Sequence, residues 1–182
     1  MTALVLIDIQ KGIQETGYYG DERNNPQAEE NCGRLLTHFR EKEWPVYHVQ
    51  HCSTNPESPL HPSKETHAFF PAVAPQGEEP VIPKNVNSAF IGTDLEQRLQ
   101  KQGIQDIVIA GLTTEHCIST STRMASNLGF DVTLISDATA AFSKEGIDGK
   151  FIAAEMVHQI ELANLKDEFA TIKDTDTVLM EL

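Results

Sequence analysis

The sequence predicts an α/β protein in which a mainly parallel β-sheet is covered by helices on both faces. Short apolar segments rich in β-forming residues, such as ALVLI at 3–7 and DIVIAG at 106–111, alternate with segments of helical periodicity. This alternation is typical of βαβ units, whose parallel strands are buried between helices. A chain of this length is expected to form one domain, residues 1–182, with a sizeable core.

The first part of the chain is expected to supply three strands and one helix. The helix over 26–42 has apolar residues at i, i+3, i+4 and i+7, namely Cys32, Leu35, Leu36 and Phe39. The strands are expected at 3–7, 45–50 and 80–84. Residues 52–80 hold many prolines and little periodicity, and a loop of this length in a compact domain is often functional.

The second part continues the alternation. A helix over 93–103 is expected to begin with a capping box made by Thr93 and Glu96 and to end at Gly103. The remaining elements are expected to be strands at 106–111, 131–136 and near 169–172, helices at 114–128 and 148–164, and a polar tail.

Three reactive side chains follow the ends of predicted strands. Asp8 follows the first strand, Lys84 ends the third, and Cys117 comes one turn of loop after the fourth. Ligands of open α/β sheets bind beyond the carboxyl ends of the strands, where these residues are expected to converge.

Together these groups suit nucleophilic catalysis. If Thr114 caps the following helix, Cys117 lies in its first turn, where the helix dipole and the ammonium of Lys84 would lower the thiol pKa and leave a thiolate at neutral pH. Asp8 would act as general base, and backbone N–H groups of 112–117 would stabilise an oxyanion. The alternative is a packing cysteine, a capping aspartate and a solvated lysine.

Three longer motifs resemble one family. LVLIDIQ, IPKNVNSAF and IAGLTTEHCISTSTRMASNLGFDVTLISDA are similar, in this order, to segments of the isochorismatase-like cysteine hydrolases, a superfamily that includes nicotinamidases and N-carbamoylsarcosine amidohydrolases. The similarity runs from about residue 3 to 165. It implies a three-layer αβα sandwich with a six-stranded, mainly parallel, Rossmann-like sheet, and a homo-oligomer, either a dimer or a tetramer.

The resemblance also implies roles for individual residues. Asp8, Lys84 and Cys117 match the family's catalytic triad. A cis peptide bond that family members carry falls at Leu112–Thr113, and the backbone amides of Thr113 and Cys117 would form the oxyanion hole.

Departures from the family pattern limit the type of bond that the protein is expected to hydrolyse. Isochorismatases proper cleave a vinyl ether without a thiol, so the cysteine favours hydrolysis of an amide, carbamoyl or ureide C–N bond through a thioester. Vinyl-ether hydrolysis and a non-catalytic binding role remain the alternatives. The aspartate-x-histidine metal motif of nicotinamidases is incomplete in HVQHCSTNPESPLHP, so no such metal and no cofactor is expected. Ile13 stands where the family usually has phenylalanine, which predicts a different pocket wall.

The remaining polar and aromatic residues have weaker signals. The candidate substrate-binding residues are Gln10, Ile13, Phe90 and Leu112, with packing as the alternative for Gln10 and Phe90. The histidines at 48, 51, 61 and 67 lack the spacing of a closed zinc site, and His51 is expected to be a pocket or loop-bonding residue. Cys32 is expected in the core, Cys52 in the loop, and His116 at the surface or an interface.

Charge and hydropathy limit the partners. A net charge of −13 disfavours nucleic acid and anionic membranes, and no apolar run is long enough to span a bilayer. The apolar start lacks the basic region of a signal peptide, so we expect a cytoplasmic enzyme acting on a small molecule.

Overall fold

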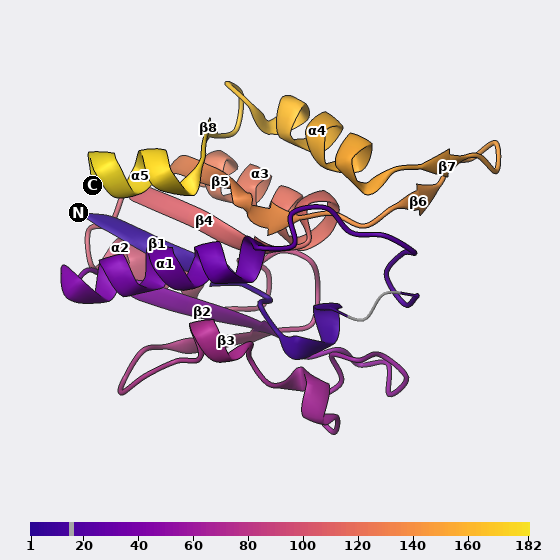
Figure 1. Cartoon of the computed structure of the whole chain (residues 1–182). Coiled ribbons are helices and arrows are strands. Elements are labelled where there is room, and N and C mark those ends of the chain that lie inside the picture. Colours follow the sequence, from indigo (N-terminus) through magenta and orange to yellow (C-terminus); the bar gives the residue numbers. More distant parts are fainter. Residues whose placement is uncertain (15–16) are drawn as a thin grey trace.

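The structure, a computed structural model that describes residues 1–14 and 17–182, contains a six-stranded sheet in the order β3-β2-β1-β4-β5-β8 (Figure 1). All the neighbouring strands of this sheet are parallel. The strands are β1 (Thr2–Ile7), β2 (Val46–His51), β3 (Val81–Lys84), β4 (Asp106–Leu112), β5 (Asp131–Ala140) and β8 (Thr171–Lys173). The predicted fold class is confirmed.

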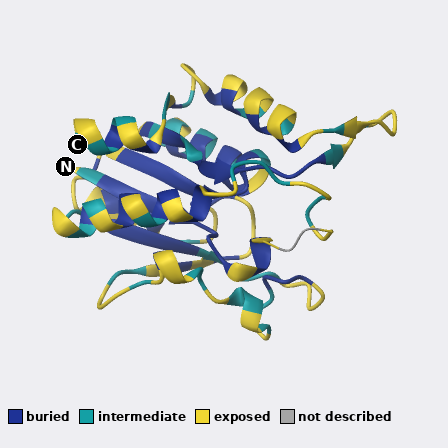
Figure 2. Ribbon diagram, in the orientation of Figure 1, coloured by how far each residue is buried: buried dark blue, intermediate teal, exposed yellow. Residues whose placement is uncertain are grey.

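Helices cover both faces of this sheet. One core lies between the sheet and α1 (Ala28–Glu41) with α5 (Thr175–Glu181), and it contains the predicted stripe of α1. The other lies beneath α2 (Leu95–Lys101), α3 (Ser119–Asn127) and α4 (Ala154–Leu165). Residues of β1 alternate between the two cores, and Figure 2 shows buried strands beneath helices with exposed outer faces. Burial on both faces explains the continuous apolar strands.

The predicted start of the helix at 93–103 needs correction. The predicted box at α2 is wrong: Asp94 occupies the N-cap without a side-chain cap bond, and the Thr93 hydroxyl donates instead to the carbonyl of Ala89 at 2.6 Å. The segment 52–80 is irregular except for two short 3₁₀ turns, η2 (Glu65–His67) and η3 (Pro71–Val73). A further 3₁₀ turn, η1 (Lys11–Gln14), follows β1.

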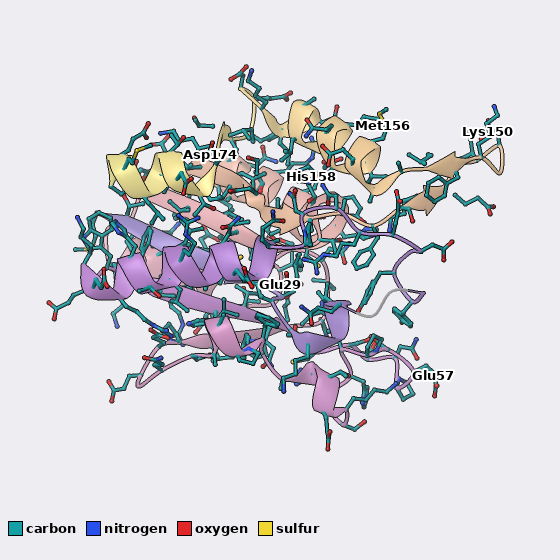
Figure 3. All side chains as sticks on the ribbon, viewed as in Figure 1. Glu29, Glu57, Lys150, Met156, His158 and Asp174 are labelled. Carbon is teal, nitrogen blue, oxygen red and sulfur yellow. The ribbon has the colours of Figure 1, made fainter. Side chains whose placement is uncertain are left out.

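The C-terminal part differs more. The helix expected at 148–164 begins later, at Ala154, because β6 (Lys144–Glu145) and β7 (Phe151–Ile152) form an antiparallel hairpin. This hairpin extends away from the sheet, with Lys150 near its tip (Figure 3). The expected polar tail is the helix α5, which begins where Asp174 accepts a hydrogen bond from the Thr177 amide at 2.7 Å.

None of the helices that the structure describes combines the length and apolar character needed to cross a membrane.

Candidate active site

Asp8 lies at the carboxyl end of β1, where β1 and β4 approach each other closely. Asp8 directly follows β1 and has a φ of +55°, a left-handed conformation that turns its side chain out of the strand course. Gly111 lies beside Ile7 in the sheet register. A Cβ atom at Gly111 would lie 2.0 Å from the Ile7 carbonyl oxygen, so only glycine allows this close approach of the two strands.

The Lys84 ammonium is the centre of the site. Its Nζ lies 2.6 Å from Asp8 Oδ2, 3.2 Å from Cys117 Sγ, 3.1 Å from His51 Nδ1 and 3.1 Å from the Val86 carbonyl oxygen. The side chains of Asp8 and Lys84 are fully buried. The other carboxylate oxygen, Asp8 Oδ1, is buried and accepts no hydrogen bond from any residue that the structure describes. The three residues from distant strand ends therefore meet, and one carboxylate oxygen is left to accept a proton.

The protonation state of Cys117 differs from the prediction. Burial raises the pKa of its thiol, the Asp8 carboxylate raises it further, and the Lys84 ammonium only partly opposes them. Burial alone would lower the pKa of Lys84, but the Asp8 carboxylate and its hydrogen bond to the ammonium raise it above its ordinary value. The structure pairs the Asp8 carboxylate with the Lys84 ammonium. The direction of the Cys117 pKa shift favours a neutral thiol beside this pair and does not support the predicted thiolate.

The turn that carries Cys117 is not the capped helix that was expected. Residues Thr114–Ile118 form a π-helical turn before α3, and the peptide bond between Leu112 and Thr113 is cis. Thr114 does not cap a helix. Its buried hydroxyl lies 2.9 Å from His158 Nδ1 and 3.1 Å from the Thr139 hydroxyl. Figure 3 shows His158 on the side of α4 that faces the sheet, so α4 and β5 together hold the turn in place.

A cavity of about 350 Å³ has Cys117 in its wall. It is lined by Asp8, Ile13, Tyr18, Tyr19, His51, Ser53, Ser58, Leu60, Asn87, Leu112, Thr113, His116 and Cys117. Of the candidate substrate-binding residues, Ile13 and Leu112 lie in this wall. The cavity is large enough for a small molecule and is walled partly by the loop 52–80.

Gln10 and Phe90 do not line the cavity. The Gln10 side chain donates to the carbonyl oxygens of His51 and His67 at 3.1 and 2.8 Å and accepts from the His51 amide at 2.9 Å. Phe90 is buried in the core and stacks on Phe130 with ring centroids 6.0 Å apart. Gln10 is therefore a loop-bonding residue and Phe90 a core residue, and neither is placed to contact a substrate in the cavity.

Sequence comparison places these residues in a known family. Residues 2–177 match the Isochorismatase domain. The chain belongs to the isochorismatase family. It is 49% identical over 177 residues to the isochorismatase family protein YrdC of Bacillus subtilis strain 168, covering 97% of this chain and 94% of that protein. Members of the family are hydrolases, and this protein is therefore a hydrolase.

A solved structure and a named enzyme extend the comparison. The crystal structure of an isochorismatase-family protein from Chromobacterium violaceum superposes with a TM-score of 0.94 at 39% identity, covering 98% of this chain and 92% of that one. Nicotinamidase 3 of Arabidopsis thaliana is 33% identical over 106 residues, which cover 58% of this chain and 48% of that protein.

One set of side chains in this isochorismatase-family site has the character of metal ligands. Within residues 1–14 and 17–182, the group is Asp8, His51 and Cys117, whose ligand atoms lie within 4.8 Å of one another. The Lys84 ammonium is in hydrogen-bond distance of a ligand atom of each. The donor set therefore already surrounds a positive charge that the chain itself supplies, and no catalytic step is assigned to a metal.

The other histidines have separate surroundings. His48 is buried and lies 2.9 Å from Glu79, while His61 bonds Ser63 within the loop. His67 Nε2 lies 3.4 Å from Cys52 Sγ. Cys52 does not line the cavity, as expected for a loop residue. Cys32 is in the core, as predicted.

The sequence interpretation missed several residues of the cavity wall. His116, expected at the surface or an interface, is half exposed and also lines the cavity. Asn87 was not singled out, although its Oδ1 lies 4.0 Å from Cys117 Sγ. Its position three residues after Lys84 was the available signal. Tyr18 and Tyr19 reach the cavity from a loop that has no periodicity to place it.

Proposed function

We propose that this hydrolase cleaves a C–N bond of an amide, carbamoyl or ureide group in a small molecule, with Cys117 as nucleophile and a thioester intermediate. The observation that carries the proposal is the ammonium of Lys84 between a buried carboxylate and a thiol, at 2.6 and 3.2 Å. The cavity beside the thiol gives the substrate access, and the Arabidopsis relative bears the name of an amide hydrolase.

In the first half-reaction, Asp8 removes the thiol proton as the sulfur attacks the carbonyl carbon. Oδ1 is the oxygen for this proton because Oδ2 is held by Lys84. The Lys84 ammonium stabilises the negative charge that develops on sulfur. The carbonyl oxygen becomes an oxyanion, for which the backbone N–H groups of Thr113 and Cys117 are the proposed donors. The C–N bond then breaks, and the proton on Asp8 passes to the leaving nitrogen.

In the second half-reaction, Asp8 carries a proton from water to the sulfur. Asp8, again a carboxylate, takes a proton from water as the water oxygen attacks the thioester carbon. The C–S bond breaks, the acid leaves, and the sulfur recovers its proton. Because Cys117 begins and ends as a neutral thiol, its raised pKa is compatible with turnover provided that Asp8 accepts the proton within the cavity.

The experiment is a panel of small amides, carbamates and ureides assayed for ammonia or amine release with the wild type and with Cys117→Ala. Cys32→Ala, which changes a core cysteine outside the cavity, is the matched control. We expect activity with the wild type and the control and at least a 10³-fold loss in Cys117→Ala, on the order of a lost nucleophile. Hydrolysis of these C–N bonds that survives in Cys117→Ala would contradict the proposal.

A homo-oligomer and a cytoplasmic location stay predictions. Sedimentation of the purified protein tests the first, and cell fractionation tests the second.

A further inference from the structure

His51 lies in the site, but the proposed reaction leaves its side chain without a role. It is the last residue of β2 and pairs with Lys84 in the register of the sheet. The Gln10 side chain holds its backbone from both sides, by accepting from the His51 amide at 2.9 Å and donating to the His51 carbonyl at 3.1 Å. Gln10 is itself buried, and its hydrogen bonds hold the backbone of His51, from which the imidazole extends.

The contact with Lys84 determines the tautomer of His51. Nδ1 lies 3.1 Å from the Lys84 ammonium, which carries only donors. Nδ1 must therefore accept, and the ring is neutral with its proton on Nε2. Burial lowers the pKa of His51, and the charge of Lys84 and the nearby His67 lower it further, against the opposing carboxylate of Asp8. The neutral thiol of Cys117 completes the charged and titratable groups around the ring.

The Nε2–H group of His51 is available to donate a hydrogen bond to a substrate. His51 lines the cavity together with Cys117 and Asn87. A ring nitrogen of His51 lies within 4.8 Å of both Cys117 Sγ and an Asp8 carboxylate oxygen, so the ring is close to the reacting atoms. No residue in the described part of the chain forms a hydrogen bond with Nε2, and this atom is not among the buried unpartnered ones.

We propose that His51 is a substrate-specificity residue whose Nε2–H donates a hydrogen bond to an acceptor atom bonded to the α-carbon of the scissile carbonyl, while its Nδ1 positions Lys84. This inference rests on the proposed amide hydrolysis and names its substrate class: small amides with an oxygen or nitrogen acceptor on the α-carbon. A donor held in a cavity discriminates against an analogue without the acceptor, because the donor is then left unpaired.

Two isosteric primary amides test the specificity. Methoxyacetamide carries an ether oxygen where butyramide carries a methylene group. We expect the wild type to prefer methoxyacetamide in kcat/KM by about tenfold, the size of one hydrogen bond, beyond the preference that the electron-withdrawing ether oxygen gives in uncatalysed alkaline hydrolysis. His51→Leu should lower the ratio to that of the uncatalysed reaction, and His51→Gln, whose amide both accepts and donates, should restore part of it. His61→Gln changes a histidine outside the cavity wall and should keep the wild-type ratio.

The tautomer is tested separately from turnover by ¹⁵N NMR of the imidazoles in the wild type, with His51→Gln to assign the signal. A neutral ring protonated on Nε2 at pH 7 supports the inference, and a ring protonated on Nδ1 or on both nitrogens overturns it. An unchanged amide ratio in His51→Leu also overturns it, with the proposed function intact. If the wild type hydrolyses neither these amides nor the panel, the proposed function fails, and the inference that rests on it fails with it.

Discussion

The buried ion pair between Asp8 and Lys84 makes a quantitative prediction about stability. Both side chains are fully buried and their charged atoms lie 2.6 Å apart. Removing one member of such a pair leaves an uncompensated charge in the interior, at a cost of about 3–5 kcal/mol. Lys84→Met should therefore lower the free energy of unfolding by this amount at pH 7, a large share of the total of about 5–15 kcal/mol for a typical domain.

The double variant separates charge pairing from packing. Asp8→Asn leaves the Lys84 ammonium with three remaining partners, the thiol of Cys117, the ring of His51 and the Val86 carbonyl. Asp8→Asn/Lys84→Met removes both charges and should be about 2 kcal/mol more stable than Lys84→Met alone. Urea unfolding followed by circular dichroism, with equal m-values, measures the three changes. Single losses under about 1 kcal/mol that simply add in the double variant would refute the reasoning.

Three further predictions concern the thiol, the strand contact and a loop carboxylate. Because burial and Asp8 raise the pKa of Cys117, its alkylation by iodoacetamide in the free enzyme should keep accelerating above pH ~9, and a plateau by pH ~7 would contradict this. Gly111→Ala should cost more than about 4 kcal/mol in urea unfolding, since its Cβ would lie 2.0 Å from a backbone oxygen; Gly103→Ala, also at positive φ but with open space around it, should cost about 1–2 kcal/mol, and equal losses would contradict the steric argument. Although burial opposes it, the Arg40 guanidinium helps to hold the pKa of Glu79 at about 2 instead of its ordinary 4.5. This carboxylate therefore stabilises the fold above pH 4.5 and loses that effect as the pH falls toward 2. The stability difference between the wild type and Glu79→Gln should shrink over the same range.

The meeting of the three reactive residues was predictable from the sequence for a simple reason. Parallel strands buried on both faces appear as apolar runs, and their carboxyl ends lie at one edge of the sheet. Asp8 and Lys84 follow or end such runs, so their meeting depends on strand order alone. Cys117 depends in addition on the short turn Thr114–Ile118 after β4.

The charge on the sulfur could not be predicted in the same way. The local sequence offers a helix start and a lysine, both of which lower a thiol pKa. The opposing effects, burial and the carboxylate of Asp8, come from residues far away in the chain. In addition, the expected cap at Thr114 is absent because its hydroxyl is used by His158 and Thr139, which belong to later elements.

The missed elements had weak but readable signals. The helix α5 lies in a polar segment, yet Asp174 precedes it and accepts a hydrogen bond from the amide three residues later. Val178 on its inner face is buried. Gln10 looked like a pocket residue because it lies close to Asp8 in sequence. Its actual partners are the backbone of His51, at the end of β2, and the carbonyl of His67. The position of His67 is set by how the loop 52–80 folds back, which no local pattern encodes.

The covalent step on Cys117 is the central claim, and intact-protein mass spectrometry tests it most directly. The wild type is mixed with the best amide of the panel and quenched in acid within the first turnover. The account predicts a mass increase equal to the acyl group minus the thiol hydrogen that it replaces, located on the peptide that contains Cys117 and absent in Cys117→Ala. Turnover of the same amide with no adduct on this cysteine at any quench time, or with an adduct on another residue, would contradict it.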